Sequence, residues 1–183
     1  IPYYWGIYGI GYDTTLFPEG LPVNSWGILF DPKIGRHNRI CMTDEPREAI
    51  LIAARYLFES LDELKKPEAQ EAVKQLLIQQ KKMVDVYTLS RADTLLQTNS
   101  CGLATIASPE AWRLSRSAPS ITMMVPKEGS FLLMDSFGIP RNTTNDALIY
   151  EFLNFIFEQE SIKHHSYQFG FCSPLQTVHL SDQ

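Results

Sequence analysis

Residues 125–140 read Val-Pro-Lys-Glu-Gly-Ser-Phe-Leu-Leu-Met-Asp-Ser-Phe-Gly-Ile-Pro, a stretch that joins a Pro and Gly turn to an apolar run and then to a single acid. The run 131–134 predicts a strand that emerges from a core, and Asp135 follows directly after it. An ionised carboxylate at the edge of apolar surface is costly unless it meets a cation or several hydrogen-bond donors. Asp135 therefore either caps a turn at the strand end or faces a positively charged group.

The composition narrows the class of protein. The chain has 183 residues, a formal net charge of -5, and 44% hydrophobic residues. Lys and Arg form no long run that could follow a phosphate backbone, so we expect no nucleic-acid partner. No apolar run reaches the length of a membrane span. The chain starts at Ile1 without a Met, so we expect a processed or excised piece of a longer protein.

Strand patterns alternate with helix patterns along the chain, and this alternation predicts an α/β architecture. Before residue 125, short strands are expected at residues 1–12, 39–42, 84–87, 102–107 and 121–124. Helices are expected from Pro46, from Pro67 and from residues 143–146, and at residues 25–30, 91–96, 109–115 and 161–167.

A second acidic stretch, Thr-Asp-Glu-Pro-Arg-Glu, covers residues 43–48 at a predicted helix start. Acids in the first turn of a helix are ordinary partners of the helix dipole. However, Glu45 and Glu48 are three residues apart and share one face of the first turn. If that face looks into a cleft, it presents two carboxylates to a cation.

The histidines give no support for a metal site. His164 and His165 are adjacent, so on a helix they point about 100° apart and cannot bind one metal in the usual i, i+4 manner. His37 lies in a basic loop and His179 in the tail. We therefore expect neither a metal nor another cofactor.

The cysteines and glycines do not point to catalysis. Cys41, Cys101 and Cys172 are too few for a disulfide scaffold and contain no zinc-type pair. They are either buried free thiols or, in an oxidising compartment, include one bridge between Cys41 and Cys101. The chain has no Gly-x-Ser-x-Gly nucleophile elbow, and no helix directly follows the glycines near the N-terminus to bind a dinucleotide. We expect a protein that is not an enzyme.

Five sequence blocks occur in order over almost the whole chain: Ile-Pro-Tyr-Tyr-Trp-Gly with Ile-Gly-Tyr, Ser-Trp-Gly-Ile-Leu-Phe-Asp-Pro-Lys, Thr-Asp-Glu-Pro-Arg-Glu, Pro-Lys-Glu-Gly with Met-Asp-Ser, and Gly-Phe-Cys-Ser-Pro. Together they resemble the periplasmic spermidine/putrescine-binding proteins of ABC importers. The resemblance implies a type II periplasmic-binding-protein fold, in which two α/β lobes close around a ligand by a hinge motion.

The resemblance also implies a domain organisation. Residues 1–8 correspond to the first hinge crossing, residues 9–125 to a complete second α/β lobe, and residues 126–183 to the second crossing and the returning, C-terminal part of lobe one. The N-terminal half of lobe one has no counterpart in this sequence.

The resemblance assigns ligand contacts residue by residue. The ligand acids would be Glu45, Glu48 and Asp135, because separated carboxylates recognise protonated amines along a flexible chain. Aromatic faces would hold the methylenes, with the walls formed by Trp5, Tyr12 and Phe171.

At three positions the sequence departs from the family pattern. Thr105 and Leu133 stand where the family often has Trp, and Phe171 stands where it has Tyr. The loss of two indole rings leaves fewer aromatic faces to contact a cation. The ligand could therefore be spermidine, putrescine, another amine or a diverged solute.

The expected function is that of a periplasmic solute-binding component of an ABC transporter, which binds a polyamine-like cation between its lobes and delivers it to a permease. One alternative is a binding protein for a different small solute. Another is a truncated module that forms a homodimer, because the open sheet edge of an incomplete lobe invites pairing.

Overall fold

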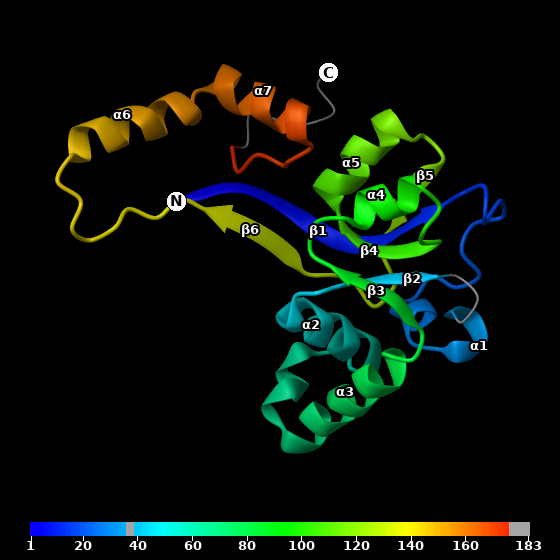
Figure 1. The fold of residues 1–183 in the computed structure, drawn as a ribbon. Coiled ribbons are helices and arrows are strands. Elements are labelled where there is room, and N and C mark those ends of the chain that lie inside the picture. The colour runs from blue at the N-terminus through cyan, green and yellow to red at the C-terminus, as the bar shows by residue number, and fades with distance from the viewer. Residues whose placement is uncertain (36–38, 176–183) are drawn as a thin grey trace. The chain divides into compact units, whose positions relative to one another are not determined.

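The computed structural model describes residues 1–35 and 39–175 and divides the chain into two compact units (Figure 1). The central unit comprises residues 8–131. The terminal unit comprises residues 1–7 together with the chain from Leu132 onward. The hinge and lobe roles assigned from the family resemblance stay predictions.

A mixed sheet forms the middle of the central unit. Its strands have the order β3-β2-β4-β1-β5, in which β2 is parallel to β3 and β4, whereas β1 is antiparallel to β4 and β5. The strand bounds are β1 Pro2–Asp13, β2 Ile40–Thr43, β3 Val84–Thr88, β4 Leu103–Ala107 and β5 Ile121–Met124. This alternation of strands and helices confirms the predicted α/β class.

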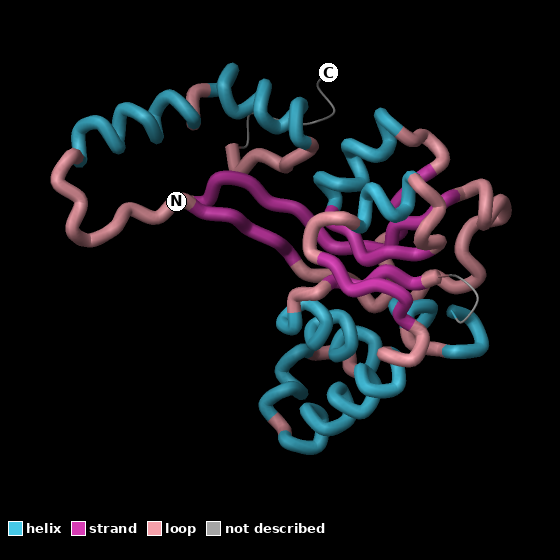
Figure 2. Tube along the Cα trace, viewed as in Figure 1, coloured by secondary structure: helices cyan, strands magenta, loops and turns pink. Residues whose placement is uncertain are grey.

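Helices cover both faces of this sheet, with α2 and α3 on one face and α4 and α5 on the other (Figures 1 and 2). Pro occupies the first turn of α2 and of α3, as predicted, and Ser25 caps η1 by accepting a hydrogen bond from the Gly27 N–H at 2.9 Å. The bounds are η1 Trp26–Leu29, α1 Pro32–Gly35, α2 Pro46–Leu57, η2 Leu61–Lys65, α3 Pro67–Gln80, α4 Ala92–Gln97 and α5 Ser108–Ser117.

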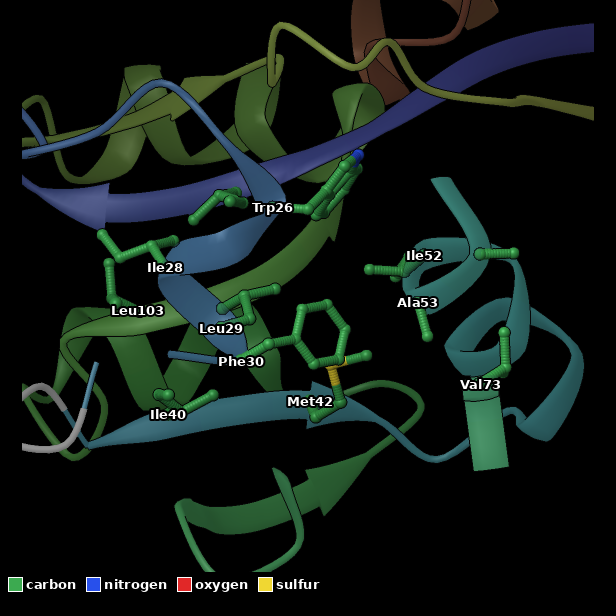
Figure 3. Close-up of a cluster of buried hydrophobic side chains, with 12 residues drawn as sticks. Trp26, Ile28, Leu29, Phe30, Ile40, Met42, Ile52, Ala53, Val73 and Leu103 are labelled. Atoms are coloured by element: carbon green, nitrogen blue, oxygen red, sulfur yellow. The ribbon is translucent and has the colours of Figure 1, made fainter. Parts of the chain in front are cut away.

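The alternation of side chains along the strands separates two cores. Ile40 and Met42 of β2 face α2 and α3, where they pack with Trp26, Ile52 and other apolar side chains (Figure 3). The residue between them, Cys41, belongs to the second core, whose other members include Leu96, Cys101, Ile106 and Leu114. These two layers hold the strand ends on which the candidate site is built.

The terminal unit is built on an antiparallel strand pair. The first residues of β1 pair with β6, Leu132–Ser136, and Trp5 forms a further bridge with Cys172. Two helices follow β6: α6 Asp146–Ile156 and α7 Gln159–Phe169. Tyr3 contacts the rings of Phe137 and Phe157, and Gly170, with φ of 76°, ends α7 in the left-handed conformation that glycine adopts readily.

The predicted position of Asp135 after a buried strand is wrong. Asp135 lies within β6, where its backbone pairs with Tyr4, and it is exposed. Leu132 and Met134 of the same strand are 61% and 55% exposed. The apolar run does form a strand, but the described residues leave the face shared by Leu132 and Met134 open. The apolar sequence of this strand therefore does not determine whether its side chains are buried.

Candidate functional site

The carboxyl ends of two neighbouring parallel strands carry the acidic residues of the central unit. β2 ends at Thr43 and β4 at Ala107, and the helices α2 and α5 begin within three residues of these ends. Because β2 and β4 are parallel neighbours, both helix starts lie at one edge of the sheet, where α/β folds commonly bind ligands. The first turns of these helices place Glu45, Glu48 and Glu110 at that edge.

Two hydroxyl groups hold the Glu48 carboxylate. The Thr43 Oγ1 donates a hydrogen bond to Glu48 Oε2 at 2.6 Å, and the Tyr8 hydroxyl is a second hydrogen-bond partner. Thr43 is 6% exposed, so its hydroxyl is fixed within the fold. Glu48 is therefore oriented by β2 and β1 and not by its own helix.

Glu45 and Glu110 each bind a backbone N–H group. Glu45 is the N-cap of α2, and its Oε1 accepts a hydrogen bond from the Arg47 N–H at 3.3 Å. The Glu110 Oε2 accepts a bond from the Ala107 N–H at 2.7 Å. Glu45 therefore acts as an ordinary acid at a helix start, because it caps the helix. The Glu48 carboxylate instead binds the Thr43 hydroxyl.

Besides burial, all three acids raise the pKa of the Tyr8 hydroxyl. Burial, then the hydrogen bond and charge of Glu48, and then the charges of Glu110 and Glu45 raise the pKa of the Tyr8 hydroxyl well above its ordinary value. Tyr8 consequently remains a neutral donor at physiological pH. All three carboxylates are close enough to act on this one hydroxyl.

Glu110 is partly buried. Burial raises its pKa, with smaller raising contributions from Asp93 and Glu48, while the Ala107 N–H and the Arg113 charge act in the opposite direction. Our sequence reasoning missed Glu110 and Tyr8. A signal for Glu110 was present, because α5, like α2, starts with a Pro in its first turn and a Glu close behind it.

Glu45, Glu48 and Glu110, here called the acidic cluster, all act on the Tyr8 hydroxyl, and the Arg113 charge acts on Glu110. The ion pairs of Lys65 with Asp62, of Lys66 with Glu63 and of Lys74 with Glu71 include none of these three acids. The three carboxylates concentrate negative charge at the sheet edge, which favours the binding of a cationic group.

In the terminal unit, Tyr4 brings two predicted site residues together. Its hydroxyl is hydrogen-bonded to the Asp135 side chain, and its ring stacks on Phe171 with centroids 3.8 Å apart and planes 13° apart. Burial, followed by the hydrogen bond and charge of Asp135, raises the pKa of Tyr4 to about 12. A carboxylate and an aromatic stack are thus adjacent, and Tyr4 is a third residue that the sequence reasoning missed.

Four predicted site residues remain: Trp5, Leu133, Tyr12 and Thr105. The Trp5 Nε1 donates to the Ser173 carbonyl at 3.3 Å, and Leu133 pairs with Gly6 in the strand ladder. The Tyr12 ring packs edge-on against Phe17, with ring centroids 5.9 Å apart. Thr105 is 5% exposed, and its buried hydroxyl has no hydrogen-bond partner among the described residues.

The histidines give no metal centre in the described structure. His164 and His165 both lie on α7, and the His165 Nδ1 is hydrogen-bonded to the Tyr3 hydroxyl. No group of three potential ligands forms among the described residues. His37 and His179 lie outside them.

Comparison with known proteins decides the family. The model of the family described as bacterial extracellular solute-binding protein matches residues 1–183. The chain belongs to this family. It is a family of solute-binding proteins and not of enzymes, and the predicted resemblance is confirmed.

Individual relatives agree with this assignment. The chain is 24% identical to the putrescine-binding periplasmic protein PotF of Escherichia coli over 90% of its own length and 48% of the relative's. It is 26% identical to the putrescine-binding periplasmic protein SpuD of Pseudomonas aeruginosa, over 87% of this chain and 47% of the relative. The chain thus spans about half the length of the curated relatives it matches.

Solved structures confirm the predicted fold. A putative spermidine/putrescine ABC transporter protein from Listeria monocytogenes superposes with a TM-score of 0.83 at 25% identity, covering 95% of this chain and 52% of that one. The α/β fold with its mixed sheet therefore corresponds to about half of a periplasmic-binding-protein structure. Within the described residues, no helix combines the length and apolarity needed to cross a bilayer.

Proposed function

We propose that this chain is part of the solute-binding component of an ABC transporter and that it binds a small polyamine-like cation such as putrescine. The observation that carries the proposal is the acidic cluster at the sheet edge, where Glu45, Glu48 and Glu110 all act on the Tyr8 hydroxyl. The names of the putrescine-binding relatives support the same ligand class.

The chemistry of a protonated diamine suits this cluster. An ammonium group donates three hydrogen bonds, and charge-assisted bonds to carboxylates are the strongest that it can make. Glu48 is fixed by the hydroxyls of Thr43 and Tyr8, so it presents its charge in one orientation before the cation arrives. This pre-organisation reduces the ordering cost of binding.

Asp135, Tyr4 and Phe171 form a second set of groups with suitable chemistry, in the terminal unit. In our proposal the carboxylate of Asp135 accepts an ammonium group, and the stacked Tyr4 and Phe171 rings contact methylene groups. Trp5, Tyr12, Leu133 and Thr105 remain predicted contacts. Delivery to an ABC permease and residence in the periplasm complete the proposed role.

Isothermal titration calorimetry on the purified chain tests the ligand class. Putrescine and spermidine are compared with butylamine, which carries one charge, and with glutamate, which carries the opposite net charge. We expect the two polyamines to bind more tightly than butylamine and glutamate to give no heat of binding. Equal binding of glutamate and putrescine, or no binding of either polyamine, would overturn the proposal.

Self-association is a second candidate, favoured by the apolar side chains that the terminal unit exposes. Leu132, Met134 and Phe155 are 61%, 55% and 61% exposed. Exposed apolar area of this kind is typical of surfaces that another polypeptide covers. Sedimentation velocity over a concentration series distinguishes the candidates, because a homodimer gives a concentration-dependent sedimentation coefficient and a monomeric binding protein does not.

A further inference from the structure

A groove on the central unit lies between α2 and α3, two helices that pack side by side (Figure 1). Its volume is about 690 Å³, and η2 and β3 complete its walls. Glu48 and the groove residue Ile50 are two positions apart on α2, so they point roughly 200° apart around the helix. The groove therefore opens on a different side of α2 from the side that carries Glu48.

One face of α3 forms the longest wall of the groove. The residues of this wall follow the spacing i, i+3, i+4, i+7, i+8 and i+11, and they are Gln70, Val73, Lys74, Leu77, Ile78 and Lys81. This is the spacing of side chains that share one helix face. Because a helix rises about 1.5 Å per residue, the wall is about 16 Å long.

The groove is built by packed elements and presents apolar side chains to solvent. Val73 is 3% exposed, whereas Ile50 and Ile78, from opposite walls, are 40% and 51% exposed. The Gln70 Nε2 donates a hydrogen bond to the Leu64 carbonyl at 2.8 Å, which ties α3 to η2. A ligand would therefore meet a surface that is already formed.

Positive charge lies along the α3 wall. Both charged side chains in the described lining of the groove are lysines, Lys74 and Lys81. The Lys74 ammonium lies 3.1 Å from the Glu71 carboxylate, which already supplies negative charge at that end. Lys81 and Lys82 follow α3, and their two charges exceed the negative partial charge of about one half at the helix end. An anionic group is therefore favoured at Lys81.

We propose that this groove binds a free fatty-acid-like carboxylate, with the carboxylate at Lys81 and the acyl chain between Ile78 and Ile50. Small-molecule sites are mostly apolar, carry a few polar groups and have volumes of roughly 300–1,000 Å³, and this groove has all three properties. The length of the α3 wall suits an extended twelve-carbon chain. A protein partner would need a larger surface, because specific interfaces bury at least about 1,000 Å².

Isothermal titration calorimetry of the full chain with dodecanoate, below its micelle concentration, tests the proposal. We expect saturable binding of one dodecanoate per chain. Octanoate should bind at least roughly tenfold more weakly, because each buried methylene group adds to the affinity. Absence of saturable dodecanoate binding, or equal affinities for octanoate and dodecanoate, would overturn the proposal.

Variants of the groove walls locate the acyl chain. Ile78→Ser should weaken dodecanoate binding by roughly tenfold, and Ile50→Ser should do the same from the opposite wall. Phe155→Ser is the matched control, because Phe155 is 61% exposed but belongs to the terminal unit. Circular dichroism checks that each variant folds. If folded Ile78→Ser and Ile50→Ser bind dodecanoate as tightly as Phe155→Ser does, the proposal is wrong.

A lysine variant tests the carboxylate end. Lys81→Gln should weaken dodecanoate binding by roughly 2–5-fold, since an exposed ion pair contributes modestly. Lys65→Gln removes the same charge from a lysine that pairs with Asp62, and it should bind dodecanoate like the natural chain. Equal affinities of the two variants would contradict the assigned role of Lys81. Putrescine titrations of the same variants report on the acidic cluster, so failure of that site and failure of the groove are distinguishable.

Discussion

The Tyr8 hydroxyl is hydrogen-bonded to the Glu48 carboxylate, and this bond joins strand β1 to the first turn of helix α2. The Thr43 hydroxyl, from β2, binds the same carboxylate at 2.6 Å. Two strands therefore orient one acid whose helix alone would leave it free to rotate. A carboxylate fixed in this way is suited to bind a cation with little loss of side-chain entropy.

Replacing Tyr8 by Phe removes one of the two hydroxyl donors and keeps the ring. We expect the affinity for putrescine to fall by roughly 2–10-fold, because a hydrogen bond is worth about 0.5–1.5 kcal/mol and Thr43 still holds Glu48. Calorimetric titration measures the change. The control is Tyr150→Phe on the exposed side of α6, which should bind like the natural chain; equal affinities for all three proteins would contradict the assigned role of Tyr8.

Stability at alkaline pH should depend on Tyr8 and Tyr4. Their pKa values are raised in the folded protein, whereas a tyrosine in an unfolded chain has a pKa of about 10. Above that pH the unfolded chain loses protons first, so the free energy of unfolding falls as the pH rises from about 10 toward 12, and it is unaffected by these groups below pH 10.

Urea midpoints of the natural chain and of Tyr8→Phe between pH 8 and 12 check this linkage. The difference between the midpoints of the two proteins reports the titration of Tyr8, because the deprotonation of lysines affects both proteins alike. We expect the natural chain to lose more stability than the variant above pH 10. Parallel curves would show that the Tyr8 hydroxyl titrates normally.

Replacing Thr105 by Val should stabilise the central unit. The Thr105 hydroxyl is buried without a hydrogen-bond partner in the described structure, and such a group costs about 1–3 kcal/mol. Val has nearly the same shape, so we expect a gain of about 1 kcal/mol in urea unfolding. A stability equal to or below that of the natural chain would contradict the assignment of an unpaired buried hydroxyl.

Replacing Gly9 by Ala should destabilise β1 by crowding. A Cβ atom there would lie 2.7 Å from the Met124 carbonyl oxygen and 2.7 Å from the Met123 Cγ, and the backbone oxygen cannot give way cheaply. We expect a loss of about 1–3 kcal/mol in urea unfolding. Gly138→Ala is the matched control, since nothing lies within 4 Å of its added Cβ. Equal stabilities of the two variants would contradict the close approach.

Much of the central unit was predictable, because its signals are local. Pro46 at the start of α2 and Ser25 as the cap of η1 lie where their backbone preferences place them. The alternation of Ile40, Cys41 and Met42 between two cores follows from strand geometry.

The parts that were missed depend on tertiary contacts. The partnership of Tyr8 with Glu48 joins residues that are far apart in sequence, and no local pattern encodes it. Asp135 was expected after a buried strand, yet Leu132 and Met134 beside it are exposed. Whether an apolar strand is buried depends on what packs against it, and hydrophobic periodicity does not carry that information.

The affinity of Glu48→Gln for putrescine, measured by calorimetry beside Glu71→Gln, tests the central claim most directly. Gln keeps the shape of the side chain and removes its charge, so we predict a loss of about 1.5–3 kcal/mol, or roughly 10–100-fold. Glu71 lies on the exposed side of α3 beside Lys74, and its variant should bind like the natural chain. If Glu48→Gln binds putrescine as tightly as Glu71→Gln does, the acidic cluster is not the cation site.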